Sequence, residues 1–376
     1  MNSTSPPSSS SSNRYNRKKL ALTNGGRTRI KYVNKISTLE TMSNELVMEL
    51  FEYFDLYSLY LTFYSLNSRF NSIICHCQVH VSLDKINPLY FTSFIGNFIY
   101  YNIDKGRIYS LQSSIPHQMT VLINDIVMDR FILLRSLTLS RCSIDLVIQI
   151  LNRIEKSILE TISITSCKKS IGRKYSLTQH LLSVERYPSL RSIHLRLCAR
   201  GIVNLTDVKI TNQTLNRLEY LSLDKPSEIE DLFHVLDLLP NLQSLNSVVN
   251  NLTDSFLISI GIKENLSLSR LRLNSSIIQI STLEYLLKIF PNLMYLYLDF
   301  STRSSKLIDS QYWIDLFEKM YLLKQVYIRI SIPLFQTNLS HEQVRDRIKL
   351  FKRPWLFTRN LINRMQTIRI IINGIK

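Results

Sequence analysis

The spacing of hydrophobic and polar positions changes along this chain and divides it into three parts. Residues 1–36 contain few large apolar side chains and are rich in serine and basic residues. In the next part Leu46, Leu50 and Phe54 stand at i, i+4 and i+8, which places them on one face of a helix. After residue 78, short strand-like segments alternate with helical ones, so the sequence predicts a disordered tail, a helical segment and an α/β region.

The helical segment predicts three short helices. Ser43 or Asn44 can cap the first helix, and Asp55 can cap the second. We expect the second helix over about 56–64 and the third over about 66–75. Helices this short carry more apolar surface than they can hide from one another, which indicates a binding partner.

The α/β region contains a repeated leucine pattern of the form L-x-x-L-x-L, with some substitutions. Helical patterns over 230–239 and 283–290 end at proline before the next strand. Each strand must stack on its neighbour to bury its leucines, so the sequence predicts a solenoid. The repeats start 24 to 31 residues apart, at Leu134, Leu159, Leu190, Leu218, Leu242, Leu268, Leu293 and Leu323.

The pattern is weaker at both ends of the α/β region. Residues 79–83 are expected to form a first strand, and 108–111 an early repeat. Residues 365–370 fit one more strand that closes the array, and the segment containing 351–355 is expected to be a loop on the last repeats.

The helical segment resembles an F-box, whose pattern runs Leu-Pro-x-Glu-Leu-Leu-x-x-Ile-Phe-x-Tyr-Leu. Residues 42–54 read Met-Ser-Asn-Glu-Leu-Val-Met-Glu-Leu-Phe-Glu-Tyr-Phe, and Leu59 and 66–70 continue the match. Ser43 stands where the family usually has proline, and serine can cap the turn that proline presets. With the leucine-rich repeats, the chain resembles the F-box and leucine-rich-repeat (F-box/LRR) family, the substrate-recognition subunits of SCF-type ubiquitin ligases.

The composition of the first residues gives a disordered tail over 1–36. The resemblance implies an F-box over 37–77 and a leucine-rich-repeat horseshoe with an irregular cap over 78–376. It also implies that the F-box binds a Skp-type adaptor and, through it, the cullin scaffold. By resemblance the residues that contact the adaptor are Met42, Leu46, Leu50, Phe51, Phe54 and Leu59. Some of these side chains must instead hold the helices together, and the sequence does not say which.

The alternate positions of each repeat strand point away from the leucines, onto the concave face of the sheet. In the early repeats these positions are small and polar, as in Ser136 and Thr138, whereas the later repeats combine arginine with tyrosine. These two residue types are enriched in binding hot spots, and arginine clusters suit acidic partners. We therefore expect an acidic protein substrate at Arg270, Arg272, Tyr295, Tyr297, Tyr327 and Arg329.

The net charge and the absence of known motifs narrow the range of functions that the sequence predicts. The net charge is +17, but eight basic residues precede residue 36 with no acidic residue before Glu40, so we do not expect a nucleic-acid partner. The sequence holds no phosphate-binding glycine loop, no catalytic serine motif and no paired zinc ligands beyond the tight group 75–77. We therefore predict no enzyme activity, no cofactor and no metal.

The five cysteines are scattered, which fits reduced thiols in the cytoplasm or the nucleus. No apolar run is long enough to span a membrane, and no secretory signal is recognisable at the start. The alternative to a ligase subunit is a leucine-rich-repeat scaffold or inhibitor that binds a protein partner without ligase activity, and it shares everything after residue 78.

Overall fold

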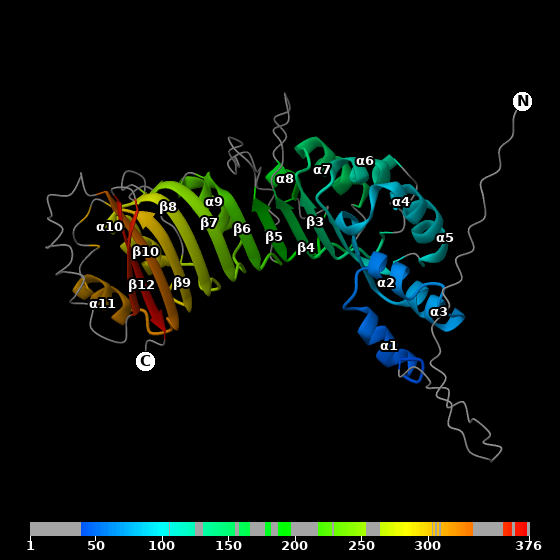
Figure 1. Ribbon diagram of the computed structural model, residues 1–376. Coiled ribbons are helices and arrows are strands. Elements are labelled where there is room, and N and C mark those ends of the chain that lie inside the picture. Colours follow the sequence, from blue (N-terminus) through cyan, green and yellow to red (C-terminus); the bar gives the residue numbers. More distant parts are fainter. Residues whose placement is uncertain are drawn as a thin grey trace, which may run out of the picture. The chain divides into compact units, whose positions relative to one another are not determined.

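The computed structural model shows a mixed α/β chain (Figure 1). It divides into two compact units, Met1–Ser43 and Asn44–Lys376, and the second holds all the helices and strands named below. The described residues are 39–104, 106–124, 131–154, 158–165, 177–181, 187–196, 217–227, 229–252, 264–302, 304, 307, 310–333, 356–362 and 365–373. The expected tail over 1–36 and the expected loop at 351–355 lie outside them, and the last two strands are described by their backbone alone.

Three short helices open the second unit, as predicted: α1 (Asn44–Phe51), α2 (Leu56–Thr62) and α3 (Ser68–His76). Asp55 caps α2 by accepting a hydrogen bond from the Ser58 amide at 3.1 Å, which confirms its predicted role. Helix α3 begins later than predicted because Asn67 takes the capping position and accepts from the Phe70 amide at 2.8 Å.

Twelve strands form one sheet in the described part of the chain, and the first ten run parallel in sequence order. The colours of Figure 1 therefore pass along the sheet in the order of the spectrum. These strands are β1 (Val79–Ser82), β2 (Ile108–Ser113), β3 (Ser136–Ser140), β4 (Thr161–Thr165), β5 (Ser192–Arg196), β6 (Tyr220–Ser227), β7 (Ser244–Leu252), β8 (Arg270–Ile278), β9 (Tyr295–Ser301) and β10 (Gln325–Pro333). The α/β prediction is confirmed, and the sheet is open because β1 and β11 are its edges.

Helices connect most of these strands, as parallel pairing requires. The predicted helices at 230–239 and 283–290 are present as α9 (Ile229–Leu238) and α10 (Ile280–Ile289). The others are α6 (Pro116–Asn124), α7 (Ile144–Arg153), α8 (Leu177–Leu181) and α11 (Ser310–Glu318). Between β1 and β2 the sequence missed the short turn η1 (Leu83–Lys85) and, after a break at Ile86 and Asn87, a continuous helical stretch. That stretch is built from α4 (Pro88–Ser93), the π-helical turn η2 (Phe94–Ile99) and α5 (Tyr100–Asn102).

The core of the sheet region consists of the repeated leucines. In β3, Leu137 and Leu139 are buried, whereas Ser136 and Thr138 between them are half-buried. The register keeps equivalent positions side by side, so the inward leucines form continuous rows across the strands. Two strands depart from this pattern with a buried serine. Ser113 of β2 stands at the position of Leu139 in β3, and Ser247 of β7 at the position of Leu273 in β8.

The sheet ends with two antiparallel strands, β11 (Leu356–Ile362) and β12 (Met365–Asn373), of which β12 pairs with β10. The strand expected at 365–370 is therefore present, but it does not continue the parallel repeat. Only two residues separate β11 from β12, and a parallel pair needs a crossover of about a dozen residues or more. Within the described residues, no helix has the length and apolar character that crossing a membrane requires.

Candidate functional site

The side chains on the outward face of the sheet alternate with the buried leucines. In β8, Arg270 and Arg272 are exposed, whereas Leu271 and Leu273 are buried. The six predicted substrate-binding residues all occupy outward positions on the neighbouring strands β8, β9 and β10. We call this set the Arg–Tyr face: Arg270, Arg272, Tyr295, Tyr297, Tyr327 and Arg329.

The register arranges the Arg–Tyr face in rows that cross the strands. Arg270 lies opposite Tyr295, and Arg272 lies opposite Tyr297. In both rows the guanidinium group lies over its tyrosine ring, with its Cζ atom 5.6 Å from the ring centroid for Arg270 and 4.3 Å for Arg272. The second row continues to Tyr327, whose ring is nearly parallel to that of Tyr297, with 4.5 Å between the centroids and an interplanar angle of 6°. These contacts hold flat cationic and aromatic groups in fixed positions on the sheet.

The third row of the face differs, because its arginine has an acidic neighbour. Arg329 lies opposite Asp299, and a guanidinium nitrogen is 3.5 Å from a carboxylate oxygen. Burial is the main cause that raises the pKa of Tyr297, and the nearby Asp299 carboxylate and Tyr327 phenol add to it. The phenol of Tyr297 is therefore neutral at physiological pH. Asp299 compensates the charge of Arg329, whereas Arg270 and Arg272 have no carboxylate this close among the described residues.

The predicted adaptor-contact residues fall into buried and accessible groups. Phe51 and Leu59 are fully buried, so these two side chains hold the helices together. Leu46 is 53% exposed, and Leu50 and Phe54 are half-buried. The structure thus sorts residues that the sequence could not, and leaves three of them accessible on or just after α1.

Further apolar side chains are exposed near these helices, and the sequence did not single them out. Tyr53, Leu61 and Leu66 are each more than half exposed. Leu66 had been placed inside the third helix, but it precedes the Asn67 cap. Met42, the remaining predicted contact, is also exposed and belongs to the first compact unit.

Aromatic side chains pack the helices α1 to α3 against one another and against the segment that follows β1. The Phe51 ring lies 4.9 Å from Phe63, and the Tyr60 ring lies 4.6 Å from Phe98 of η2. The second contact joins α2 to the helical stretch between β1 and β2. The helices therefore share a core with the beginning of the sheet region, and this agrees with their membership of one compact unit.

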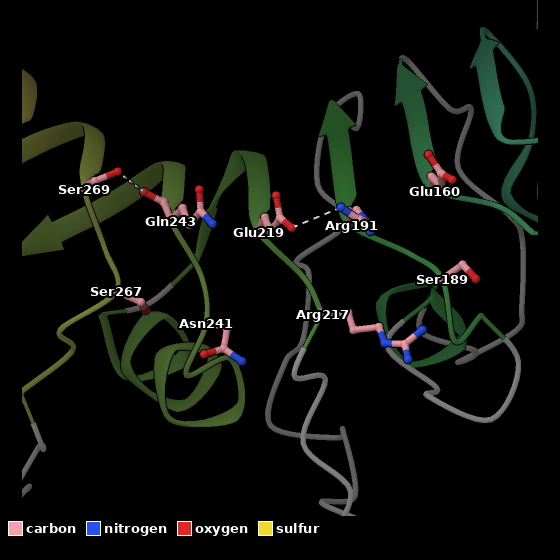
Figure 2. Close-up of a pocket in the computed structure, with 9 residues that line it drawn as sticks. All are labelled: Glu160, Ser189, Arg191, Arg217, Glu219, Asn241, Gln243, Ser267 and Ser269. Atoms are coloured by element: carbon pink, nitrogen blue, oxygen red, sulfur yellow. Dashed lines mark hydrogen bonds and ion pairs between the residues drawn. The ribbon is translucent and has the colours of Figure 1, made fainter.

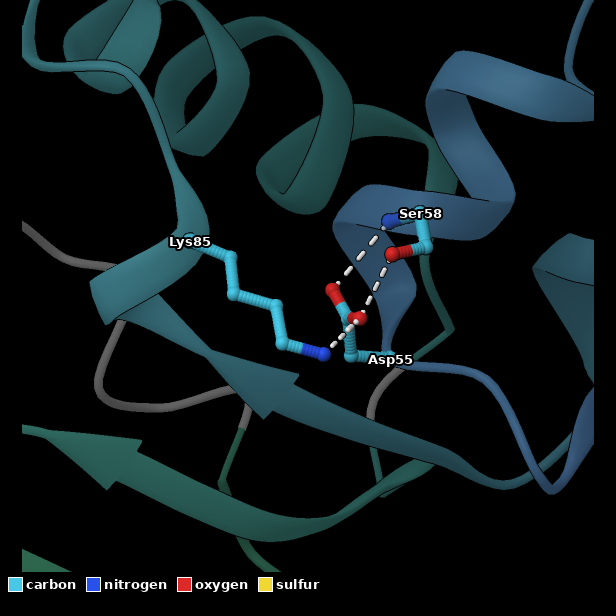
Figure 3. A network of polar contacts seen from close by, with 3 residues as sticks. All are labelled: Asp55, Ser58 and Lys85. Atoms are coloured by element: carbon cyan, nitrogen blue, oxygen red, sulfur yellow. Dashed lines mark hydrogen bonds and ion pairs between the residues drawn. The ribbon is translucent and has the colours of Figure 1, made fainter.

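Asp55 adds a polar link at the same junction (Figure 3). Its carboxylate accepts hydrogen bonds from the Ser58 amide at 3.1 Å and the Ser58 hydroxyl at 2.6 Å, and forms an ion pair with Lys85 at 2.7 Å. Burial raises the pKa of Asp55, but the hydrogen bonds from Lys85 and Ser58 outweigh burial and leave it below its usual value. The cap of α2 thus also ties this helix to the segment after β1.

A histidine and a serine lie close together beside this junction. His80 Nδ1 is 2.8 Å from the Ser110 hydroxyl, and burial lowers the pKa of His80. A catalytic triad needs a carboxylate bonded to the imidazole. Among the described residues the nearby Asp55 carboxylate bonds to Ser58 and Lys85 instead, so the pair has no triad geometry.

The cysteines show no catalytic or metal-binding arrangement in the part of the chain that the structure describes. Cys75, Cys77 and Cys142 are free thiols there, and no cluster of metal-ligating side chains occurs among the described residues. Burial raises the pKa of Cys77 and Cys142 to about 11, so both thiols stay protonated and unreactive at neutral pH. Cys167 and Cys198 lie outside the described residues.

A polar groove of about 940 Å³ lies where β4 to β8 begin (Figure 2). Both of its glutamates have an arginine nearby: Glu219 is 3.6 Å from Arg191 of the groove, and Glu160 is 3.8 Å from Arg135 outside it. The sequence did not reveal this groove, although it contains a recurring signal. A charged or polar residue stands one position before each of the strands β4 to β8. The groove is lined by Glu160, Ser189, Arg191, Arg217, Glu219, Asn241, Gln243, Ser267 and Ser269.

Two surfaces therefore remain as candidates for binding: the cationic Arg–Tyr face and the apolar side chains exposed around α1 and α2. Neither a scan against protein-family models nor a search of the curated proteins finds a match for this chain.

Proposed function

We propose that this chain is the substrate-recognition subunit of a cullin-RING (SCF) ubiquitin ligase. In this proposal the helices α1 to α3 are an F-box that binds a Skp-type adaptor, and the parallel sheet with its helices is a leucine-rich-repeat domain that binds a protein substrate. The chain itself supplies no catalytic group. It raises the local concentration of substrate beside a ubiquitin-conjugating enzyme, in the cytoplasm or the nucleus.

The observation that carries the proposal is the pattern of buried and exposed side chains in the segment that resembles an F-box. It forms three short helices that bury Phe51 and Leu59 among other apolar side chains, while Leu46 is left more than half exposed. Exposed large apolar groups on such a small helical unit favour a protein partner. The ten parallel strands in sequence order, with inward leucines, support the second half of the proposal.

The test is a pull-down with a purified Skp-type adaptor, comparing the wild type with Leu46→Asp and with the double variant Leu46→Asp, Leu50→Asp. Leu266→Asp is the matched control, since Leu266 is a similarly exposed leucine just before β8. Circular dichroism checks that each protein is folded. We expect stoichiometric binding by the wild type and the control, and loss of binding by the folded Leu46 variants.

A folded wild type that does not bind the adaptor would overturn the ligase proposal. It would favour the alternative, a repeat scaffold or inhibitor that binds its partner without ligase activity.

A further inference from the structure

The two arginines of β8 differ in their neighbours from Arg135, Arg191 and Arg329. Arg135, Arg191 and Arg329 each lie within 3.8 Å of a carboxylate oxygen. Arg270 and Arg272 have no such ion pair among the described residues. The register places Ser244 and Tyr295 beside Arg270, and Asn246 and Tyr297 beside Arg272, so their cross-strand neighbours are uncharged.

The stacking contacts fix how these two charges are presented. Each guanidinium rests against a tyrosine ring of β9, at 5.6 Å for Arg270 and 4.3 Å for Arg272. A cation–π contact with a ring does not use up the N–H donors of a guanidinium, so they stay available for other partners. Holding the side chain in place also lowers the entropy that a ligand must overcome when it binds. Both arginines are therefore prepared to receive anionic oxygens.

The spacing of the arginines sets the spacing of the anions. One buried residue, Leu271, separates Arg270 from Arg272, so both project from the same face of β8. A strand rises about 3.3 Å per residue, which puts their Cα atoms about 7 Å apart. An extended ligand has the same rise and the same alternation, so its side chains at i and i+2 match the two arginines.

We propose that the Arg–Tyr face binds an extended segment with anionic side chains at two positions separated by one residue, each paired with one arginine of β8. The anions are carboxylates or phosphates, which present the same oxygens to a guanidinium. The inference rests on the proposed function, because it names the kind of segment that the substrate presents to the repeat domain.

The test uses the full-length chain and uncharged-capped peptides of glycine and serine that carry two glutamates. The glutamates are adjacent, separated by one residue, or separated by three residues, at the same net charge. A fourth peptide carries two phosphoserines separated by one residue. Isothermal titration calorimetry at low salt measures each affinity.

We expect the peptide with one intervening residue to bind at least about tenfold more tightly than either other glutamate peptide, since each of those can engage only one arginine well. Arg270→Gln with Arg272→Gln should abolish this preference. Arg272→Lys, which keeps the charge but loses the stacked planar group, should weaken binding severalfold. Arg153→Gln removes an exposed arginine of α7 and should leave binding unchanged.

The phosphoserine peptide separates two sources of the anion. Tighter binding than the glutamate peptide identifies a phosphorylated segment as the ligand, and equal or weaker binding identifies an acidic one. Equal affinity for all spacings, preference for the wider spacing, or an equal loss with Arg153→Gln would overturn the inference.

Adaptor binding is measured with the same proteins, which keeps the two proposals distinguishable. The Arg270→Gln, Arg272→Gln variant should still bind the adaptor. Adaptor binding without any spacing preference would overturn the inference alone. A spacing preference without adaptor binding would overturn the ligase proposal and leave the inference about the sheet standing.

Discussion

The helices over 44–76 and the sheet face over 270–329 expose opposite kinds of side chain. The helical segment leaves the apolar side chains of Leu46, Leu61 and Leu66 more than half exposed. The sheet face presents Arg270 and Arg272, held by stacking on tyrosine. Exposed apolar side chains favour a stable protein–protein interface, whereas a solvated cationic surface suits a ligand that binds transiently. The chain thus presents two exposed surfaces of different chemistry, and in the proposed function each of them binds a different partner.

The largest expected effect concerns the division between buried and exposed residues in the helices. Phe51→Ala should lower the free energy of unfolding by about 3–5 kcal/mol, because it removes a fully buried ring that contacts Phe63. Leu46→Ala should change it by less than about 0.5 kcal/mol, since that side chain is mostly exposed. Urea unfolding monitored by circular dichroism measures both. Similar losses for the two variants would contradict the division.

The next largest expected change in stability comes from a substitution at the junction between the helices and the first strands. Asp55→Asn should lower the free energy of unfolding by about 1–2 kcal/mol, because it weakens the α2 cap and removes the ion pair with Lys85. The pKa of this carboxyl is lowered in the folded state, so its contribution is complete above the ordinary value of 3.8 and is lost as the pH falls below it.

The measurement is urea unfolding of wild type and Asp55→Asn between neutral pH and about pH 3. The difference between the two proteins should be constant near neutral pH and shrink in acid. Glu49→Gln is a control that changes an exposed carboxylate of α1. A difference that grows in acid would have the wrong sign and would contradict the role of Asp55.

Salt should separate the two surfaces directly. Binding of the doubly acidic peptide by Arg270 and Arg272 should weaken about tenfold between low salt and about 0.5 M salt, since exposed charges are screened over a few ångströms there. Adaptor binding through Leu46 should change little, because burial of apolar surface does not depend on charge. Parallel titrations of the same protein provide the comparison. Equal salt sensitivity would show that the two surfaces are not different in kind.

Much of the fold could be predicted because the repeated leucines serve one purpose, burial. The pattern located most of the parallel strands and put Leu137 and Leu139 on the inside, and it put Arg270 and Arg272 on the outside. It failed where a residue's role depends on partners distant in the chain. Phe51 and Leu46 are both large apolar residues of the same predicted helix, so the sequence did not show which of them is buried.

The same limit explains what the sequence missed at the candidate sites. The stacking of Arg272 on Tyr297, the pairing of Arg329 with Asp299 and the polar groove at the start of β4 to β8 arise only when successive repeats are brought into register. The antiparallel end was missed for another reason, because a leucine-like pattern specifies a strand but not its direction.

The smallest expected effect tests whether stacking itself prepares the sheet face. Tyr297→Leu removes the ring beneath Arg272 but leaves its charge, so affinity for the doubly acidic peptide should fall about two- to fivefold, the size of an exposed cation–π contact. Tyr327→Leu removes a ring from the same row while sparing the contact between Arg272 and Tyr297, and should have a smaller effect. Isothermal titration calorimetry resolves the two. Equal losses of affinity in the two variants would mean that the tyrosine rings contribute only apolar surface. A loss confined to Tyr297→Leu would show that this tyrosine sets the orientation of Arg272.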